Sequence, residues 1–422
     1  MNGFNLSDIT DAKLGAATLG GIYLGSTKLW PLSTDYSKEY LTFESLADNN
    51  TITWTFTGSD PIQNVIYWSK NGTSWTSAIA STSDTPVSLA TLNKGEKMYL
   101  KGENVTYALS TSDYSHFNSD YEFNVSGNIM SLIYGDNFIG QITLSSSYNF
   151  TGIFRSSKVY DASNLILPAT TLTKLCYRSM FDGCTSLATA PVLPATTLAQ
   201  SCYSNMFNGC TSLATAPVLP ATTLANYCYY NMFYGCTSLA TAPVLPATTL
   251  ASSCYAYMFE GCSSLATAPE LPATTLANSC YMSMFAGTKI TSAPELPATI
   301  LADSCYRNMF YGCASLIYPP TLNATILQPR CYQHMFFGCT SLKTAPELPA
   351  TTLTNYCYAY MFQNCTSLSY IKCLATNISA SNSHDWWLYN VASTGTFTKK
   401  ASMTSWPSGA HGIPSGWTVV NV

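Results

Sequence analysis

Apolar residues in the middle of the chain return at every fourth position. In the representative segment LPATTLANYCYYNMFYGCTSLATAPV these positions hold Leu224, Cys228 and Met232, and Tyr229 and Phe233 lie one residue further on. Apolar residues at i, i+4 and i+8 are typical of one face of a short helix. The stretch CTSLATAPVLP, which is punctuated by prolines, predicts an extended strand. The pattern therefore predicts a unit of one strand and one helix.

Residues at the ends of the expected helix favour the same interpretation. Pro220 and the pair Thr222-Thr223 precede the periodic stretch and suit a helix start with a hydroxyl cap. Gly235 follows the last periodic residue and suits a left-handed helix stop.

The unit is repeated eight times between residues 163 and 370. The repeat is marked by the first cysteine of each unit, namely Cys176, Cys202, Cys228, Cys254, Cys280, Cys305, Cys331 and Cys357. Their spacing is 26 residues, except for 25 between Cys280 and Cys305. One strand and one helix cannot bury an apolar face alone, so the units must stack. We therefore expect an α/β solenoid, a right-handed stack of eight strand–helix units.

The repeat pattern L-P-x(3)-L-x(3)-C-Y-x(2)-M-F-x-G-C-T-S-L resembles the BspA-like (Treponema pallidum-type) leucine-rich repeat. The hallmark of that family is an L/I-P step followed by A-F-x-x-C-x-x-L, and Met-Phe stands here where Ala-Phe is common. Unit five loses one residue and its second cysteine at Gly287-Thr288-Lys289-Ile290, and unit seven has Asn323 in place of proline. The resemblance implies a solenoid used in adhesion or surface recognition, and it implies no catalytic residues.

The sixteen cysteines allow three interpretations. Small buried core residues are the favoured one, because free cysteine is among the most buried residue types. Disulfides within each unit would leave Cys280 and Cys373 without partners, whereas bonds between adjacent units stay geometrically possible. Zinc is disfavoured, because the spacing is not CxxC-like and the chain has four histidines.

Residues 1–32 form a separate segment in our interpretation. The stretch YLGSTKLWP resembles the N-terminal tag of virion proteins from phages of gut anaerobes. The resemblance implies attachment to another virion protein by strand addition, with Tyr23, Leu24, Leu29 and Trp30 as the attachment residues. The alternative is a β-hairpin that packs on the next domain.

Residues 33–127 predict a small all-β, sandwich-like domain. Apolar and polar residues alternate in 51–56 and in 97–101. Asn71-Gly72 lies between the apolar stretches 66–68 and 75–76 and is a strong hairpin signal. The letters SKNGTSW around it resemble a shortened Asp-box, a feature that stabilises hairpins and does not imply enzymatic chemistry.

The remaining segments are expected to cover the ends of the stack. Residues 128–162 predict an N-terminal cap, and residues 371–422 predict a C-terminal cap with a β-hairpin. Cap packing is the simplest role for Trp386 and Trp387. The alternative is a sugar platform, because aromatic faces supply stacking area.

Composition excludes some classes of function. Charged residues make up 9% of the chain and the net charge is −4, so nucleic-acid binding is not expected. No apolar run is long enough to span a bilayer. The first residues carry Asp8 and Asp11 and lack a basic region, so we expect no secretory signal.

No motif points to catalysis. The four histidines have no nucleophile motif beside them, and the repeat carboxylates Glu270, Glu295 and Glu347 share one unit position. A stripe of equivalent carboxylates differs from the convergent pair that a glycosidase needs. We expect no enzymatic activity, no cofactor and no metal site.

Binding is better supported, because a few unit positions vary while the core repeats. Tyr, Asn, Ser and Arg at such positions are typical of a recognition surface, although neutral variation of a solvated face is the alternative. The candidate binding residues are Tyr227, Tyr230, Asn231, Tyr234, Tyr257, Arg307, Tyr311, His334 and Tyr360.

Two functional hypotheses follow. The first is a phage virion protein (a tail-fibre, receptor-binding or head-decoration component) that docks through its N-terminal segment and binds a host-surface glycan or protein. The resemblance to fibre-like virion proteins, which are often trimeric, implies a homotrimer. The alternative is a bacterial cell-surface adhesin of the BspA-like type.

Overall fold

The computed structural model describes residues 35–59, 63–80, 85–144 and 146–422, together with the backbone of four short strands before them. These strands form two antiparallel pairs, β1 (Lys13–Leu14) with β2 (Ala17–Thr18) and β3 (Ile22–Leu24) with β4 (Thr27–Trp30). The side chains of Tyr23, Leu24, Leu29 and Trp30, the expected attachment residues, lie outside the described part of the structure.

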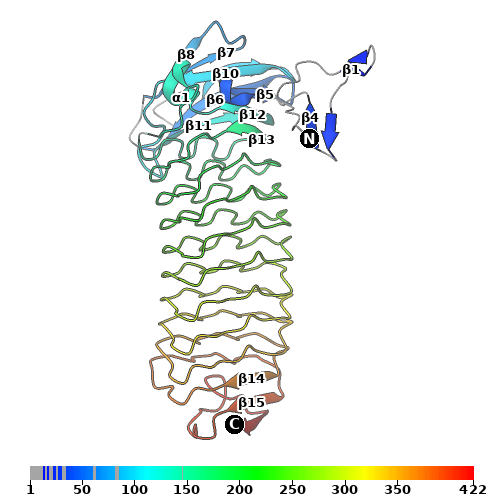
Figure 1. The fold of residues 1–422 in the computed structure, drawn as a ribbon, viewed down its shortest axis with the longest axis vertical. Coiled ribbons are helices and arrows are strands. Elements are labelled where there is room, and N and C mark those ends of the chain that lie inside the picture. The colour runs from blue at the N-terminus through cyan, green and yellow to red at the C-terminus, as the bar shows by residue number, and fades with distance from the viewer. Residues whose placement is uncertain are drawn as a thin grey trace, which may run out of the picture.

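The described chain begins with a β domain, drawn in blue to green at one end of Figure 1. Its first sheet has the strand order β13 (Val159–Ile166), β12 (Phe123–Asn128), β5 (Leu41–Ser45), β10 (Lys97–Gly102), β7 (Val65–Ser69), β8 (Thr76–Ile79). Its second sheet has the order β11 (Tyr114–Ser119), β6 (Asn50–Thr57), β9 (Val87–Leu92). Phe43 of β5 meets Phe117 of β11 edge-on at 5.0 Å, so the two sheets share one aromatic core.

Short helical segments and a hairpin complete this domain. The α-helix α1 (Ser131–Tyr134) and the 3-10 helices η2 (Tyr36–Lys38) and η3 (Gly135–Asn137) lie beside the first sheet. The hairpin predicted at Asn71-Gly72 is confirmed, since β7 and β8 pair in antiparallel register.

The strand β13 connects the β domain to the repeats. It pairs in parallel with β12, and Asp161 forms a parallel bridge to Thr189 of the first repeat. The Ala162 amide donates to the Thr189 carbonyl at 3.0 Å. The hydrogen bonding of the sheet therefore passes directly into the stack.

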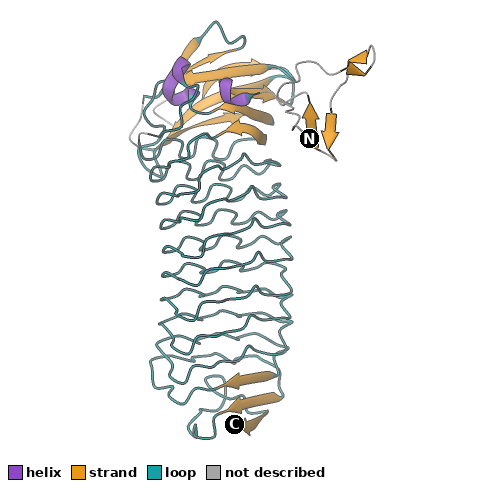
Figure 2. Ribbon diagram, in the orientation of Figure 1, coloured by secondary structure: helices purple, strands orange, loops and turns teal. Residues whose placement is uncertain are grey.

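The predicted α/β solenoid of strand–helix units is wrong, because the repeats contain no helix. Residues 167–369, all of which the structure describes, form a stack of coils built from turns and isolated parallel bridges. Figure 2 shows this stack as loops. Amides alternate in their bonding: Tyr203 donates to the Cys228 carbonyl of the next coil at 3.0 Å, whereas Cys202 donates to Ala199 of its own coil.

The repeats form no α-helix because a residue with a left-handed backbone conformation occurs at every fourth position. In one coil these residues are Ser201, Asn205 and Gly209, with φ between 54° and 68°. An α-helix requires negative φ throughout. A chain of four-residue turns also places apolar side chains at i, i+4 and i+8, so this spacing does not distinguish the two structures. The glycine interpreted as a helix stop, Gly235, is one of these left-handed turn residues, at φ 67°.

Two aromatic ladders fill the core of the stack. Tyr203 and Tyr229 stack with ring centroids 6.0 Å apart, and Phe207 and Phe233 stack at 5.6 Å. The corresponding residues of all eight units continue both ladders and are buried. The parallel stacking of identical side chains fixes the register between neighbouring coils.

The cysteines form two further buried columns. All sixteen are buried and free. In the second column the thiol donates to a phenylalanine carbonyl of the preceding coil, as Cys210 does to Phe181 at 3.1 Å. Unit five has Thr288 at this position, and its hydroxyl donates to Phe285 of its own coil at 2.8 Å. A hydroxyl thus takes the place of the thiol without leaving the donor unpaired.

The same turns continue beyond the eight units. On the N-terminal side, Phe150 stacks on Tyr177 at 5.8 Å and its amide donates to Cys176. On the C-terminal side, Asn382 and Trp386 have positive φ at the equivalent positions. Both expected cap regions therefore contain a further coil that the sequence pattern does not show.

The C-terminal sheet differs from the expected hairpin. The strands β14 (Tyr370–Cys373), β15 (Gly395–Lys399) and β16 (Trp417–Asn421) pair with one another in parallel. The expectation of a β-hairpin in this cap is wrong, because each strand repeats the path of the previous coil.

Candidate functional site

The side chains that vary between units gather on one strip of the stack. We call this strip the turn face and define it by the second, third and sixth residues after the first cysteine of each coil. In unit three these residues are Tyr230, Asn231 and Tyr234. They project from the turns whose alternate amides bond to the neighbouring coils, so a rigid backbone positions them.

A tyrosine cluster lies on the turn face of units three and four. The rings of Tyr227 and Tyr230 meet at 5.8 Å, and the rings of Tyr230 and Tyr257 meet at 5.3 Å. The Tyr257 hydroxyl approaches the Met282 sulfur of the next coil at 3.8 Å. Tyr227 remains 41% exposed, so the cluster offers aromatic surface to a ligand, and Tyr234 of the same coil is 39% exposed.

A second aromatic cluster lies on units six to eight. Tyr311 and Phe337 stack in parallel at 4.5 Å, and His334 and Tyr360 stack at 4.6 Å. His334 and Phe337, from the same coil, lie 5.9 Å apart. Two aromatic pairs therefore stand side by side on this part of the turn face.

Buried polar atoms without partners are concentrated on the turn face. Eight of its polar atoms are buried yet have no hydrogen-bond partner in the described part of the chain: Ser204 Oγ, Asn205 Oδ1, Asn231 Oδ1, Glu260 Oε2, Arg307 Nε, Asn308 Oδ1, Gln333 Oε1 and His334 Nδ1. A buried polar atom that lacks a partner is costly. Each of these atoms is shielded from solvent, so they are polar groups packed beneath the turn face and are not exposed to a ligand.

Burial also shifts the titration of charged groups on this face. Burial raises the pKa of the Glu260 carboxyl. Burial, together with the nearby Arg307 guanidinium, lowers the pKa of His334 to about 4. At neutral pH His334 is therefore an uncharged imidazole that can both donate and accept a hydrogen bond.

The third residue after the first cysteine of each coil has a backbone conformation that costs free energy for most residue types. Residues there are left-handed, and asparagine tolerates this conformation well, as at Asn231. Tyr257, His334 and Tyr360 adopt the same conformation with φ between 55° and 60°. Bulky residues at positive φ are uncommon and cost about 1–2 kcal/mol each. Their presence favours a role for the side chain itself.

The nine predicted binding residues all belong to this strip or to its margin. Tyr227 lies at the margin and contacts the turn-face residue Tyr230. The structure places Tyr230 and Tyr257 in the first cluster and Tyr311, His334 and Tyr360 in the second. Asn231, Tyr234 and Arg307 belong to neither cluster, so the nine residues are not brought together. Our sequence list omitted Glu260 and Phe337, although both precede the glycine at the same variable position as Tyr234 and Tyr311.

The two tryptophans proposed as a sugar platform have different surroundings. Trp387 is fully buried, stacks on Trp406 at 5.2 Å and donates to the Gly412 carbonyl at 3.1 Å. It offers no face to a sugar. Trp386 is 37% exposed and packs against His411 at 4.7 Å.

Among the residues that the structure describes, no group of three or more His, Cys, Asp or Glu side chains is arranged to hold a metal ion. None of the described helices is both long and apolar enough to cross a membrane.

These features define a repeat protein in which a uniform core carries a variable face. Residues 177–317 and 304–409 match the BspA type leucine rich repeat region in six copies, and together they span more than half of the chain. The protein therefore belongs to the BspA-type leucine-rich repeat proteins. No curated protein and no solved structure matches it.

Proposed function

We propose that this protein is a non-enzymatic adhesion protein that binds a glycan or protein of another surface through its turn face. The observation that carries the proposal is the pair of aromatic clusters on that face, in which tyrosine, histidine and phenylalanine rings of successive coils contact one another. Tyr227 and Tyr311 remain 41% and 40% exposed, so a sugar ring or an apolar protein side chain can pack on them.

The residue types in these clusters support the same role. Tyrosine supplies large, rigid contact area with little loss of conformational entropy. The left-handed residues Tyr257 and Tyr360 keep bulky rings at positions where asparagine would be less strained. Strain retained at such positions is typical of sites under functional constraint.

The family match bears on where the protein acts. It lies within the repeats and the C-terminal segment, and it favours the surface adhesin of a bacterium over the virion protein. The virion hypothesis rests on residues 1–32, and the match gives it no support. We therefore propose the bacterial cell surface as the location and a glycan or protein of a facing surface as the partner.

The test is binding of the full chain to a printed glycan array and to immobilised mucin. The turn-face variant carries Tyr230→Ser, Arg307→Ser and Tyr360→Ser. The matched control carries Val192→Ser, Val218→Ser and Val244→Ser, three residues outside the turn face that are 69–77% exposed.

We expect the wild type and the valine control to bind equally, and the turn-face variant to lose at least tenfold in affinity. Equal binding by all three proteins would show that the ligand sits elsewhere. The absence of binding to every glycan and to mucin would contradict the glycan form of the proposal and leave a protein ligand, to be sought by the same pair of variants.

A further inference from the structure

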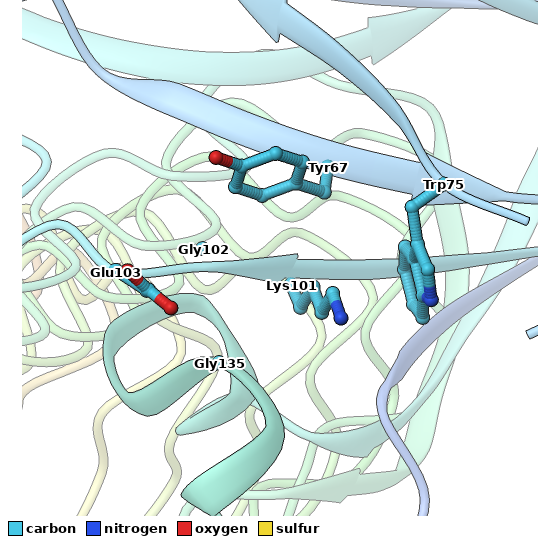
Figure 3. Close-up of a pocket in the computed structure, with 6 residues that line it drawn as sticks. All are labelled: Tyr67, Trp75, Lys101, Gly102, Glu103 and Gly135. Atoms are coloured by element: carbon cyan, nitrogen blue, oxygen red, sulfur yellow. The ribbon is translucent and has the colours of Figure 1, made fainter. Parts of the chain in front are cut away.

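A cavity in the β domain, far along the chain from the turn face, has the features of a second binding site. Its volume is about 250 Å³, and Tyr67, Trp75, Lys101, Gly102, Glu103 and Gly135 line it. Figure 3 shows Trp75 and Glu103 at opposite ends, with Tyr67 and Lys101 between them. The volume is below the range of about 300–1,000 Å³ typical of drug-sized ligands, so one small ring fits it.

Local structure positions the aromatic residues of this cavity. Lys101 of β10 lies directly opposite Tyr67 of β7 in the sheet, so both side chains project from one face. The loop before Trp75 is held by Asn71, whose Oδ1 accepts from the amides of Thr73 and Ser74 at 3.0 and 2.9 Å. The Asp-box-like stretch thus places the indole at the edge of the cavity.

Lys101 is fixed and its charge is compensated. Its Nζ lies 4.3 Å from the centroid of the Trp75 ring and 2.7 Å from Asp136 Oδ1. The Tyr40 hydroxyl also donates to Asp136 at 2.7 Å, and the two donors hold the pKa of that carboxyl below its ordinary value. Lys101 therefore presents its remaining N–H groups in a defined direction without a free positive charge.

The charged group of Glu103, unlike that of Lys101, has no partner in the described part of the chain. No hydrogen bond or ion pair engages its side chain among the described residues. Gly135 makes room for it, because a Cβ at Gly135 would come within 3.2 Å of Glu103 Oε1. Gly135 has a φ of +52°, which also favours glycine. The carboxylate therefore lies over bare backbone and faces the open space.

The charged and aromatic groups of the cavity limit the kind of ligand that it can bind. The Lys101 ammonium already lies over the Trp75 ring, so this ring face is not available to bind a cationic ligand. An anion would meet the free Glu103 carboxylate, while Asp136 already neutralises Lys101. A neutral ring with several hydroxyl groups uses both ends, because it can donate to Glu103 and accept from Lys101 while its apolar face packs on Tyr67.

We propose that this cavity binds one neutral monosaccharide unit of a glycan, held between the Glu103 carboxylate, the Lys101 ammonium and the Tyr67 ring. The site does not depend on the turn face, so on this proposal the protein carries two recognition sites on one chain. Two weak sites that engage the same surface bind it more tightly than either site alone.

The test is saturation-transfer NMR and calorimetry on the full chain. The probes are the neutral methyl glycosides of glucose, galactose, mannose, fucose and N-acetylglucosamine, with choline and methyl glucuronide as charged comparisons. The variants are Glu103→Gln, which keeps the side-chain shape, and Tyr67→Ala. The matched control is Glu122→Gln, an exposed glutamate outside the cavity.

We expect at least one neutral glycoside to bind, and Glu103→Gln and Tyr67→Ala each to weaken it about tenfold, as expected for the loss of a charge-assisted hydrogen bond or of ring contact. Glu122→Gln and the turn-face variant should bind the glycoside normally, which separates this site from the proposed adhesion face. Failure of every neutral glycoside, tighter binding of choline or glucuronide, or unchanged binding by Glu103→Gln would each overturn the proposal.

Discussion

The imidazole of His334 lies parallel to the ring of Tyr360 in the next coil, at a centroid distance of 4.6 Å and an angle of 3°. The two residues occupy the same position of successive units, and both are left-handed, at φ 55° and 59°. The contact links a pH-sensitive group to the aromatic part of the turn face. It also depends on coil-to-coil stacking, which no short segment of the chain could produce alone.

The first prediction concerns acid stability. The pKa of His334 falls from 6.5 in the unfolded chain to about 4 in the folded one, because burial and Arg307 disfavour the imidazolium. Between these values the unfolded chain binds more protons, so stability is lost as the pH falls from about 6.5 to 4. The ring is partly exposed, so we expect a loss of only about 1 kcal/mol from this group.

Urea unfolding of wild type and His334→Asn at pH 7 and pH 4 measures this effect. Asparagine does not titrate and tolerates the left-handed backbone. The wild type should lose about 1 kcal/mol more than the variant between the two pH values. Equal losses would show that His334 does not carry this pH dependence.

The second prediction concerns strain at the turn face. Tyr257→Asn should change the free energy of unfolding by less than about 1 kcal/mol, because relief of left-handed strain offsets the lost ring contact with Tyr230. The control Tyr255→Asn removes a buried ring of the core ladder two residues earlier and should cost about 3–5 kcal/mol. A large loss of stability in Tyr257→Asn would mean that this tyrosine serves the fold.

The third prediction concerns the cysteine columns. The thiols are buried, and burial raises the pKa of Cys357 and of Cys313 to about 11, so the reactive thiolate is suppressed. A thiol reagent should label few cysteines in the native protein. After unfolding without reductant it should label most of the sixteen. Labelling of none after unfolding would indicate disulfides between adjacent coils.

The fourth prediction concerns the C-terminal end of the stack. Trp387→Ala should destabilise the last coils by about 3–5 kcal/mol, because its fully buried ring packs between Tyr358 and Trp406. Its neighbour Trp386 is 37% exposed, and Trp386→Ala should cost less than about 1 kcal/mol. Hydrogen exchange should show faster exchange of residues 357–391 in Trp387→Ala alone. Equal effects of the two substitutions would contradict this assignment.

The fold was only partly predictable from the chain. Repetition identified the stack and its core residues, such as Cys228, Met232 and Phe233, which are all buried. The spacing of four residues led to the wrong local structure, since it suits both a helix and successive turns. Residues that tolerate positive φ, such as Ser201 and Asn205, would distinguish turns from a helix. This sequence signal is weak, because Tyr227 and Tyr257 adopt positive φ too.

The two candidate sites also differ in how far the sequence alone reveals them. Variation within the repeats located the turn face, because a variable position over a constant core can be seen in one sequence that repeats eight times. The cavity of the β domain could not be found like this. Tyr67, Glu103 and Gly135 are distant in the chain, and no repetition marks them.

The sequence by itself determined the period, the buried columns of the core and the positions free to vary, because each of these is written eight times in the chain. Only the tertiary structure decided that the units are coils of left-handed turns, that a further coil stands at each end, and which polar atoms are left without partners. The physical reason is that alternate amides find their acceptors in the next coil, as Tyr203 does at Cys228. Such a bond has no local signature, and it exists only once the coils are stacked.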